Sequence, residues 1–254
     1  VGSVFLVSDT TISNYAGEFD AGCLPDGRLL VAWEEYGAVT NIAYQLFAAA
    51  GIPSTIKAVA NTDGLDVRHW SPAVTADDQG NFAIVWEDYR NGSAEIFFRR
   101  FNTLGLAYAA EIALGDAFAP DSARLIPDIA YSSGDGYIVA WVDLRQGQNL
   151  FMQQLDNSGS PVNDNVLISG ETSDEPNWQV ALDINANGNL LAGWAVYGAE
   201  RRIMLQKFGS GLQFDGLPKP VSSINSALKY EPSIAGNSGG NTCLAWTDLS
   251  PGLG

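Results

Sequence analysis

Four carboxylates lie on or beside short apolar stretches that resemble one another, and carboxylates placed in this way could perform acid–base chemistry. They are Asp20, Asp128, Asp183 and Glu231. If the stretches are strands around a common axis, the carboxylates converge there, and a pair can divide into an acid and a base or nucleophile, as glycosidic bond cleavage requires. The four do not share one position in the chain's repeats, and the chain has 29 acidic residues, so coincidence explains their placement equally well.

A second set of charged residues follows tryptophans. Asp88 and Asp143 each lie two residues after a tryptophan, and Arg90 and Arg145 lie two residues further on. The repeated Asp-x-Arg predicts turns in which the carboxylate accepts backbone N–H bonds and the arginine bridges to a neighbour. The alternative is a ring of charged side chains that binds a ligand.

Three aromatic residues share another repeated position. Trp70, Trp178 and Tyr230 each lie sixteen residues before a tryptophan. Their flat faces could stack on sugar rings. They also share strand parity with apolar residues such as Val74 and Leu182, which favours packing between sheets as their role.

Composition limits the other kinds of chemistry. His69 is the one histidine, which excludes multi-histidine metal sites and makes any histidine-based triad depend on this residue. Turns such as DDQGN could bind calcium weakly, but they lack the ligand number of a recognised calcium loop. No phosphate-binding Gly-Lys-Ser/Thr motif occurs. We therefore expect no cofactor.

Charge and hydropathy limit the partners. Thirteen basic and 29 acidic residues give a formal net charge of −16, which opposes binding to nucleic acid or to anionic lipid. No apolar run approaches the ~20 residues of a membrane span, so we expect neither membrane insertion nor a signal peptide in the sequence. The start at Val1 indicates a processed or trimmed chain. A glycan or a protein is the expected partner, and the chain could belong to a larger polypeptide or assembly.

The spacing of five tryptophans reveals the elements that position these residues. Trp33, Trp86, Trp141, Trp194 and Trp246 are separated by 53, 55, 53 and 52 residues. We call them the anchor tryptophans. Each ends an apolar run that follows a glycine-containing turn, and comparable stretches precede the turn and follow the tryptophan. Each repeat therefore reads as four short strands, the pattern of a β-propeller blade.

The runs that end at the anchor tryptophans discriminate between architectures. LLVAW, FAIVW and YIVAW are apolar at every position, so both faces of these strands must be buried. An antiparallel sheet usually leaves one face to water, whereas a strand within a blade is covered by the neighbouring blades. We predict an all-β protein, a five-bladed β-propeller with four-stranded antiparallel blades.

The ends of the chain are predicted to share the last blade. Residues 4–9, VFLVSD, resemble the fourth strand of a repeat, and the fifth repeat lacks a third strand. The N-terminal strand would close the last blade and cover its edge. We expect one domain, 1–254, with repeats at about 15–63, 64–118, 119–172, 173–225, and 226–254 together with 1–14.

Two cysteines fall in blades that ring closure would make neighbours. Cys23 lies in the first repeat and Cys243 in the fifth. A disulfide between them would restrict the unfolded chain and stabilise the closed ring. Because their strand positions differ, two unpaired buried thiols are the alternative.

The repeat pattern, an Asp/Asn-Gly turn, an apolar run ending in tryptophan and then W-x-D-x-R, resembles the repeats of secreted bacterial β-propellers that are loosely sialidase-like. The resemblance covers nearly the whole chain and implies an extracellular or cell-surface location with an adhesive or sugar-related role. The sialidase Asp-box places its glycine three residues before the tryptophan, whereas Gly27, Gly80, Gly188 and Gly240 lie six before it. We therefore carry over no catalytic residues.

These observations favour a non-catalytic extracellular binding or assembly module that recognises a glycan or a protein. The alternative is a glycoside hydrolase of the five-bladed propeller type that uses axial carboxylates. An enzyme requires at least two carboxylates that face one pocket, about 5–10 Å apart. A binding module needs no such pair.

Overall fold

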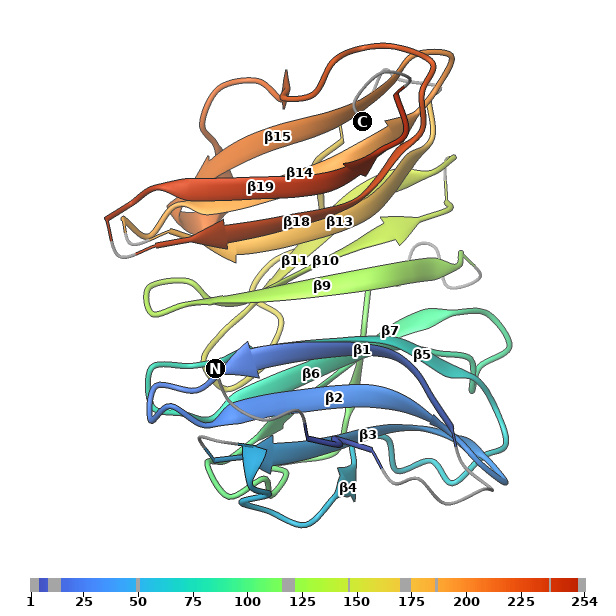
Figure 1. The fold of residues 1–254 in the computed structure, drawn as a ribbon, viewed down its shortest axis with the longest axis vertical. Helices are drawn as coiled ribbons and strands as arrows, with labels where there is room; N and C mark the ends of the chain where they lie inside the picture. Colours follow the sequence, from blue (N-terminus) through green and yellow to red (C-terminus); the bar gives the residue numbers. More distant parts are fainter. Residues whose placement is uncertain are drawn as a thin grey trace. The chain divides into compact units, whose positions relative to one another are not determined.

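The computed structural model describes residues 5–8, 15–48, 51–115, 122–145, 147–169, 175–185, 187–237 and 239–250. These residues form antiparallel β-sheets and one short 3-10 helix, η2 (Ser210–Leu212) (Figure 1). Among them, no helix is long and apolar enough to cross a membrane. The chain divides into two compact units, 1–114 and 115–254. The prediction of a single domain stays a prediction.

The first unit contains two four-stranded sheets. Sheet 1 consists of β1 (Tyr15–Cys23), β2 (Leu29–Tyr36), β3 (Thr40–Phe47) and β4 (Ala58–Val59). Sheet 2 consists of β5 (His69–Ala76), β6 (Phe82–Asp88), β7 (Glu95–Phe101) and β8 (Ile112–Leu114). The strands of each sheet pair in chain order, which is the predicted blade topology.

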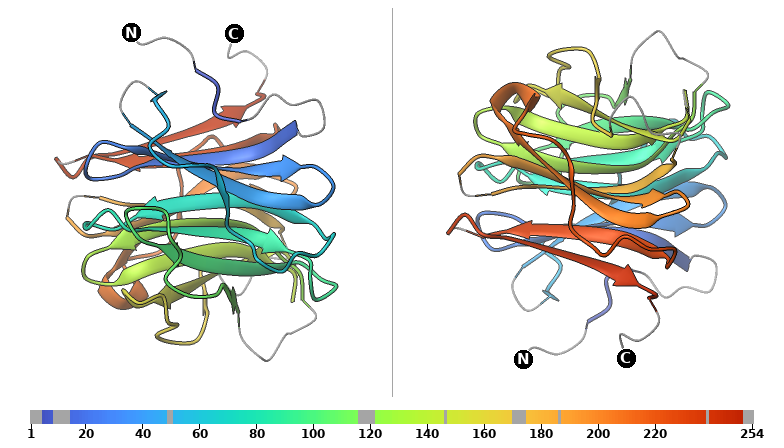
Figure 2. Two further views of the ribbon diagram at one scale, coloured as in Figure 1. Left: turned by 90° about the horizontal axis from the view of Figure 1, so that it is seen from below. Right: turned by 90° about the horizontal axis from the view of Figure 1, so that it is seen from above.

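The second unit contains three sheets. Sheet 3 consists of β9 (Arg124–Ser132), β10 (Gly136–Asp143), β11 (Asn149–Leu155) and β12 (Val166–Leu167). Sheet 4 consists of β13 (Asn177–Ile184), β14 (Leu190–Tyr197) and β15 (Arg201–Gly209), with β16 (Gln213–Phe214) and β17 (Lys219–Pro220) both paired to β15. Sheet 5 consists of β18 (Lys229–Gly236) and β19 (Thr242–Asp248). Figure 2 shows that the strands of each sheet are twisted, as antiparallel sheets are.

A tight turn joins the first and second strands of each sheet. In sheet 2, Gly80 has φ 78°, a conformation that glycine adopts without steric cost. The Asp77 carboxylate accepts the N–H groups of Gln79 at 2.9 Å and Asn81 at 2.8 Å. The turn therefore satisfies its own polar groups and fixes the register of the hairpin.

The second strand of each complete sheet is buried on both faces. Every residue of β6 and β10 is buried, and the four anchor tryptophans Trp33, Trp86, Trp141 and Trp194 are at most 2% exposed. Within the first unit, Leu30 and Tyr44 of sheet 1 belong to one core cluster with Val74 and Phe82 of sheet 2. The prediction of strands covered by neighbouring sheets is confirmed.

Sheet 5 differs from the prediction. In the described part of the chain, β18 and β19 pair only with each other, and Trp246 is only half-buried. Phe5–Val7 has no strand conformation, and the Phe5 ring packs against Phe47 of sheet 1 with centroids 5.6 Å apart. Val4 and Asp9 lie outside the described residues. A closing strand over residues 4–9 is therefore not seen, because apolar contacts with sheet 1 engage Phe5 and Val7.

The first strand of every sheet contains a β-bulge at the same place. The pairing register shifts there in all five sheets. In sheets 2 to 5 the residue fifteen before the anchor tryptophan has a positive φ; these residues are Ser71 (50°), Ile126 (50°), Gln179 (53°) and Glu231 (54°). Non-glycine residues rarely adopt this conformation, and such strain and such bulges concentrate near functional sites.

Candidate functional site

A hollow of about 590 Å³ opens at the bulges of sheets 1 and 2 in the first unit. Its lining residues are Gly17, Glu18, Glu34, Tyr36, Trp70 and Ser71. Gly17 and Glu18 come from β1, Glu34 and Tyr36 from β2, and Trp70 and Ser71 from β5. We call it the bulge hollow. It combines two carboxylates, a phenol and an indole.

Glu34 supplies the buried carboxylate of the bulge hollow and is 4% exposed. Its Oε1 accepts the backbone N–H of Ser71 at 2.8 Å. Its Oε2 accepts the Tyr36 hydroxyl at 2.5 Å and the backbone N–H of Glu18 at 3.3 Å. Three donors from three segments hold this carboxylate in one orientation, which is how a fixed negative charge is preorganised.

Glu18 supplies the second, solvent-exposed carboxylate. Its Oε2 accepts the Ser71 hydroxyl at 3.2 Å. Ser71 therefore contacts both carboxylates, Glu34 through its backbone and Glu18 through its side chain. The neighbouring Gly17 is required by space, because a Cβ there would collide with the Glu34 carboxylate and the Tyr36 ring.

The bond that the Ser71 N–H donates to Glu34 holds Ser71 in its strained conformation, because this N–H lies in the bulge itself. Sheets 4 and 5 repeat the device with an amide in place of a carboxylate. Gln179 Oε1 accepts the N–H of Glu231 at 2.8 Å and the Tyr197 hydroxyl at 3.3 Å. The bulge is therefore a regular feature of the repeats. In the first unit, two carboxylates, Glu18 and Glu34, contact the bulge residue Ser71.

Trp70 forms a wall of the bulge hollow and is half-buried. The Arg68 guanidinium lies over its ring at 4.8 Å, and the Tyr89 ring meets it edge-on with centroids 5.6 Å apart. The other two aromatic candidates, Trp178 and Tyr230, are half-buried in the second unit, and Trp178 packs against its core cluster. Among the three, Trp70 is the one that lines this hollow.

Three of the four carboxylates proposed for catalysis tie neighbouring first strands together. Asp20 on β1 accepts the N–H of Val74 on β5 at 2.8 Å, and Asp128 on β9 accepts the N–H of Leu182 on β13 at 2.6 Å. Asp183 on β13 accepts the N–H of Gly236 on β18. Burial raises the pKa of Asp20, although the bonds from Val74 and Ala21 oppose the shift.

The fourth of these carboxylates, Glu231, is exposed on the bulge of β18, and Thr247 Oγ1 lies 3.4 Å from its Oε2. None of the four lines the bulge hollow. The assignment of catalysis to them stays a prediction. Their shared location on first strands is confirmed.

The acidic turn residues are inaccessible. Asp88 and Asp143 are fully buried, and each accepts the indole N–H of its anchor tryptophan, at 3.0 Å and 3.3 Å. Each also accepts the backbone N–H of the arginine two residues later, Arg90 at 3.0 Å and Arg145 at 2.9 Å. Burial opposes ionisation, but bonds from His69 and Arg90 lower the pKa of Asp88. This geometry matches the interpretation as turn-forming residues.

The arginines of these turns pack on aromatic rings. The guanidinium of Arg90 lies over Phe97 at 4.1 Å, and that of Arg145 lies over Phe151 at 4.2 Å. Burial opposes ionisation of Asp143 as well, but bonds from Arg145 and Ser122 lower its pKa. Both arginine side chains are therefore largely buried by these contacts, which leaves little of them exposed for a ligand.

The turn considered for calcium binding lies between β5 and β6. In the DDQGN turn, Asp77 Oδ2 accepts a hydrogen bond from Asn81 Nδ2 at 2.8 Å and lies 3.4 Å from Arg100 Nη2, so protein donors contact this carboxylate. Calcium binding there stays a prediction.

Cys23 and Cys243 are both free and exposed. The alternative of two buried thiols is wrong, and the disulfide stays a prediction.

Glu18, Glu34 and Tyr36 were missed by reasoning from the sequence. Glu34 directly follows an anchor tryptophan, and the segment WEEY of repeat 1 matches WEDY of repeat 2. In the second repeat the Tyr89 hydroxyl likewise donates to Glu87, at 3.2 Å. The repeated Trp-Glu-x-Tyr was therefore the available signal.

Comparison with known proteins supplies the fold. No family model matches the chain, and no curated protein matches its sequence. Solved structures match well. An α-L-arabinanase from Penicillium chrysogenum, complexed with arabinobiose, aligns over 91% of this chain and 74% of its own, with 12% identity and a TM-score of 0.66.

Two bacterial structures agree with this match. An α-L-arabinofuranosidase from Lactobacillus brevis aligns over 94% of this chain and 85% of its own, with 12% identity and a TM-score of 0.58. An endo-arabinase from Bacteroides thetaiotaomicron aligns over 86% and 84%, with 10% identity and a TM-score of 0.55. Together with the five sheets, these likenesses show that the chain has a β-propeller fold.

The comparisons correct two expectations drawn from the sequence. The similar structures named above are an arabinanase, an arabinofuranosidase and an endo-arabinase, which overturns the preference for a non-catalytic module and for no enzymatic activity. None of the three matched structures is a sialidase. Of the sialidase-like resemblance, the β-propeller fold and the link to carbohydrate are retained. At identities of 10–12% the likeness establishes the fold.

Proposed function

We propose that this chain is a glycoside hydrolase that acts on neutral glycans, with Glu18 and Glu34 as its carboxylate pair. One observation carries the proposal: both carboxylates line one hollow, where Ser71 contacts each of them. Paired carboxylates beside a sugar-sized hollow are the requirement for glycosidic bond cleavage. The similar arabinan-degrading structures support the same reaction class and make arabinose-containing glycans the first substrates to test.

The two carboxylates differ in ways that suit different roles. Glu34 is buried and held by three donors, so it can stabilise the positive charge that develops on the sugar ring in the transition state. Glu18 is exposed and can exchange protons with solvent, so it can serve as the acid or base at the leaving oxygen or at the attacking water. Ser71 orients Glu18 through its hydroxyl.

The lining of the bulge hollow indicates the class of glycan. The indole of Trp70 offers an apolar face for a sugar ring. Two carboxylates, in a chain with a net charge of −16, repel uronic acids and other anionic sugars. Neutral furanosides or pyranosides fit this chemistry best. An extracellular or cell-surface location, where polymeric glycans are met, is part of the same proposal.

The test is hydrolysis by the purified chain. Linear arabinan, arabinobiose and 4-nitrophenyl arabinofuranosides are assayed first, followed by a panel of other neutral 4-nitrophenyl glycosides and polygalacturonate. We expect turnover of at least one neutral substrate and none of polygalacturonate. Glu34→Gln and Glu18→Gln should each lower kcat/KM by about 100-fold or more.

Glu87→Gln is the matched control, because Glu87 has the same repeat position as Glu34 and accepts a hydrogen bond from the equivalent tyrosine, Tyr89, but does not line the bulge hollow. It should keep most of the activity. Full activity in both Glu18→Gln and Glu34→Gln would move the chemistry to another site. Absence of turnover on the whole panel would remove the proposal.

A further inference from the structure

A buried position at the start of the first strand changes residue type from sheet to sheet. It lies seventeen residues before the anchor tryptophan and holds His69, Arg124, Asn177 and Lys229 in sheets 2 to 5. Their exposures are 0%, 2%, 1% and 0%. Charged residues are almost never buried this fully without a partner. The residue that faces this position in each sheet accounts for the residue type found there.

In three sheets the buried residue faces the aspartate two positions after the anchor tryptophan. His69 Nε2 lies 3.4 Å from Asp88 Oδ2, and Arg124 Nε lies 3.5 Å from Asp143 Oδ2. In sheet 5, Lys229 Nζ lies 3.6 Å from Asp248 Oδ1. Arginine and lysine carry a positive charge at neutral pH. The equivalent histidine therefore stands where sheets 3 and 5 place an arginine and a lysine.

The two remaining sheets lack this aspartate and also lack the cation. In sheet 4 the aspartate is replaced by Val196, and the neutral Asn177 accepts the Trp194 indole N–H at 3.0 Å in its place. In sheet 1 the position holds Ala16, and Glu35 pairs with Lys57 at 2.5 Å instead. A cation thus occurs at this position only opposite the aspartate.

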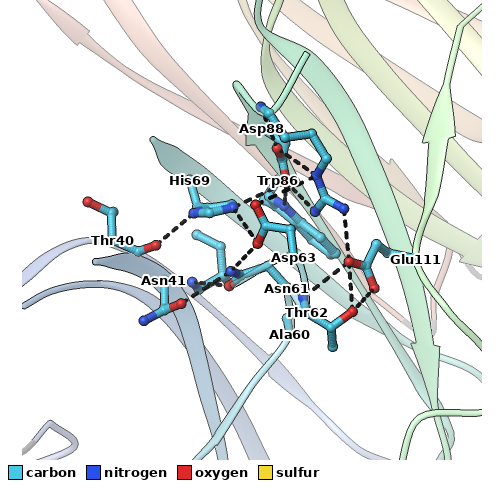
Figure 3. Close-up of polar contacts among 12 residues, drawn as sticks. Thr40, Asn41, Ala60, Asn61, Thr62, Asp63, His69, Trp86, Asp88 and Glu111 are labelled. Carbon is cyan, nitrogen blue, oxygen red and sulfur yellow. Dashed lines mark hydrogen bonds and ion pairs between the residues drawn. The ribbon is translucent and has the colours of Figure 1, made fainter. Parts of the chain in front are cut away.

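Both ring nitrogens of His69 face oxygen atoms (Figure 3), although only Nδ1 has hydrogen-bond geometry to its partner among the described residues. Nδ1 lies 2.7 Å from the carbonyl oxygen of Thr40 on β3. Nε2 lies 3.2 Å from Asp63 Oδ1, in the segment before β5, and 3.4 Å from Asp88 Oδ2 on β6. Carbonyl and carboxylate oxygens only accept, so a proton on each nitrogen avoids placing a ring lone pair against an oxygen lone pair.

The charges around His69 balance when it is protonated. Asp63, Asp88 and Glu111 supply three negative charges on this side of sheet 2. Arg90 contacts Asp88 at 2.6 Å and Glu111 at 3.0 Å, and Arg99 lies 3.8 Å from Glu111. The imidazolium is the third positive charge. Asp63 Oδ2 is buried and has no hydrogen-bond partner among the described residues, so it depends on these cations.

We propose that His69 is an imidazolium in the folded protein and forms a pH-dependent link between β3, the segment before β5, and β6. The link is specific to sheet 2, because the equivalent positions of sheets 3 and 5 hold arginine and lysine in place of histidine. His69 directly precedes Trp70 of the bulge hollow. The link therefore positions the wall of the hollow, but its test does not depend on the proposed activity.

The sign of the pH dependence follows from the pKa of His69. Burial opposes the charge, but Asp88, Asp63 and the Thr40 carbonyl outweigh burial and raise the pKa above its ordinary value of 6.5. A raised pKa means that the stabilisation is complete below about pH 6.5 and is lost as the pH rises through the folded-state value. Above that value, Asp63 and Asp88 keep only the arginines as counter-charges.

The first measurement is the protonation state, and the single histidine makes it unambiguous. Nitrogen-15 NMR of the imidazole at pH 7 should show a proton on both Nδ1 and Nε2 in the folded protein. A neutral ring with one proton at pH 7 would overturn the proposal. This readout requires no substitution and no substrate.

The second measurement compares thermal unfolding of the wild type with His69→Lys and His69→Arg, which copy sheets 5 and 3. Between pH 6 and pH 9 the wild-type Tm should fall by about 2–4 °C relative to both variants. Parallel profiles would contradict the link. His69→Asn should lower Tm at every pH, and if it fails to fold, the lysine variant and the NMR result still decide.

A third arm separates a proton from a metal ion. Zn²⁺ at pH 7 should leave the Tm of the wild type and of His69→Lys equally unchanged, because Arg90, Arg99 and the imidazolium already balance the carboxylates. Stabilisation of the wild type by Zn²⁺ that EDTA reverses, and that His69→Lys abolishes, would identify a metal site in place of the proposed charge.

Discussion

Glu34 on β2 accepts the backbone N–H of Ser71 on β5 at 2.8 Å, and this bond joins sheet 1 to the bulge of sheet 2. The bond does two things at once. It satisfies a polar group that the bulge removes from the strand ladder, and it fixes a strained residue that contacts the second carboxylate of the bulge hollow. Stability and the geometry of the hollow are therefore coupled through one side chain.

Glu34→Ala is expected to destabilise the first unit, because it leaves the backbone N–H of the half-buried Ser71 without its acceptor. An unsatisfied buried donor costs about 1–3 kcal/mol. Glu34→Gln retains an amide oxygen for the same N–H, as Gln179 does for Glu231 in the second unit, and should cost less. Denaturant unfolding followed by tryptophan fluorescence measures both. Equal losses for the two variants would show that the negative charge, and not the acceptor, matters.

Ser71 is expected to tolerate glycine better than valine. At φ 50° a side chain is strained, and a strained left-handed residue costs about 1–3 kcal/mol. Ser71→Gly removes this strain and should leave the free energy of unfolding within about 1 kcal/mol of wild type. Ser71→Val adds a branch at Cβ and should lose clearly more. If valine is tolerated as well as glycine, the bulge is not the rigid element described above.

Most of the fold could be predicted from the sequence, since the near-regular spacing of five tryptophans predicted five sheets, and runs such as FAIVW predicted the strands buried on both faces. It did not predict the pair of Glu18 and Glu34. That pair depends on a bond between Glu34 and Ser71, 37 residues apart, and on a bulge that no residue type signals. The bridging role of Asp20 was missed for the same reason, because Val74 lies 54 residues away.

Asp20 and Asp128 provide a matched pair for the bridges between first strands. They share one repeat position, thirteen residues before the anchor tryptophan. Asp20 accepts two backbone N–H groups, from Ala21 and from Val74, both at 2.8 Å. Asparagine has one acceptor oxygen, so its NH₂ would face one of these donors.

Asp20→Asn and Asp128→Asn should therefore each destabilise the protein by about 1–3 kcal/mol. Asp26→Asn, at an exposed turn whose partner is Arg28, should change stability by no more than about 0.5 kcal/mol. Urea unfolding compares the three. If Asp26→Asn costs as much as the other two, the loss reflects charge removal in general and not the bridges.

Trp33 and Trp86 occupy the same repeat position, yet their indole N–H groups differ. Trp86 Nε1 donates to the buried Asp88 at 3.0 Å, whereas Trp33 Nε1 is buried and finds no acceptor among the described residues. Replacement by phenylalanine removes similar volume at both sites, but only Trp86→Phe takes a donor from a buried carboxylate. Trp86→Phe should therefore cost about 1–2 kcal/mol more than Trp33→Phe in the free energy of unfolding. Urea denaturation at pH 7 measures the difference, and an equal or larger cost for Trp33→Phe would mean that packing alone sets the value of these indoles.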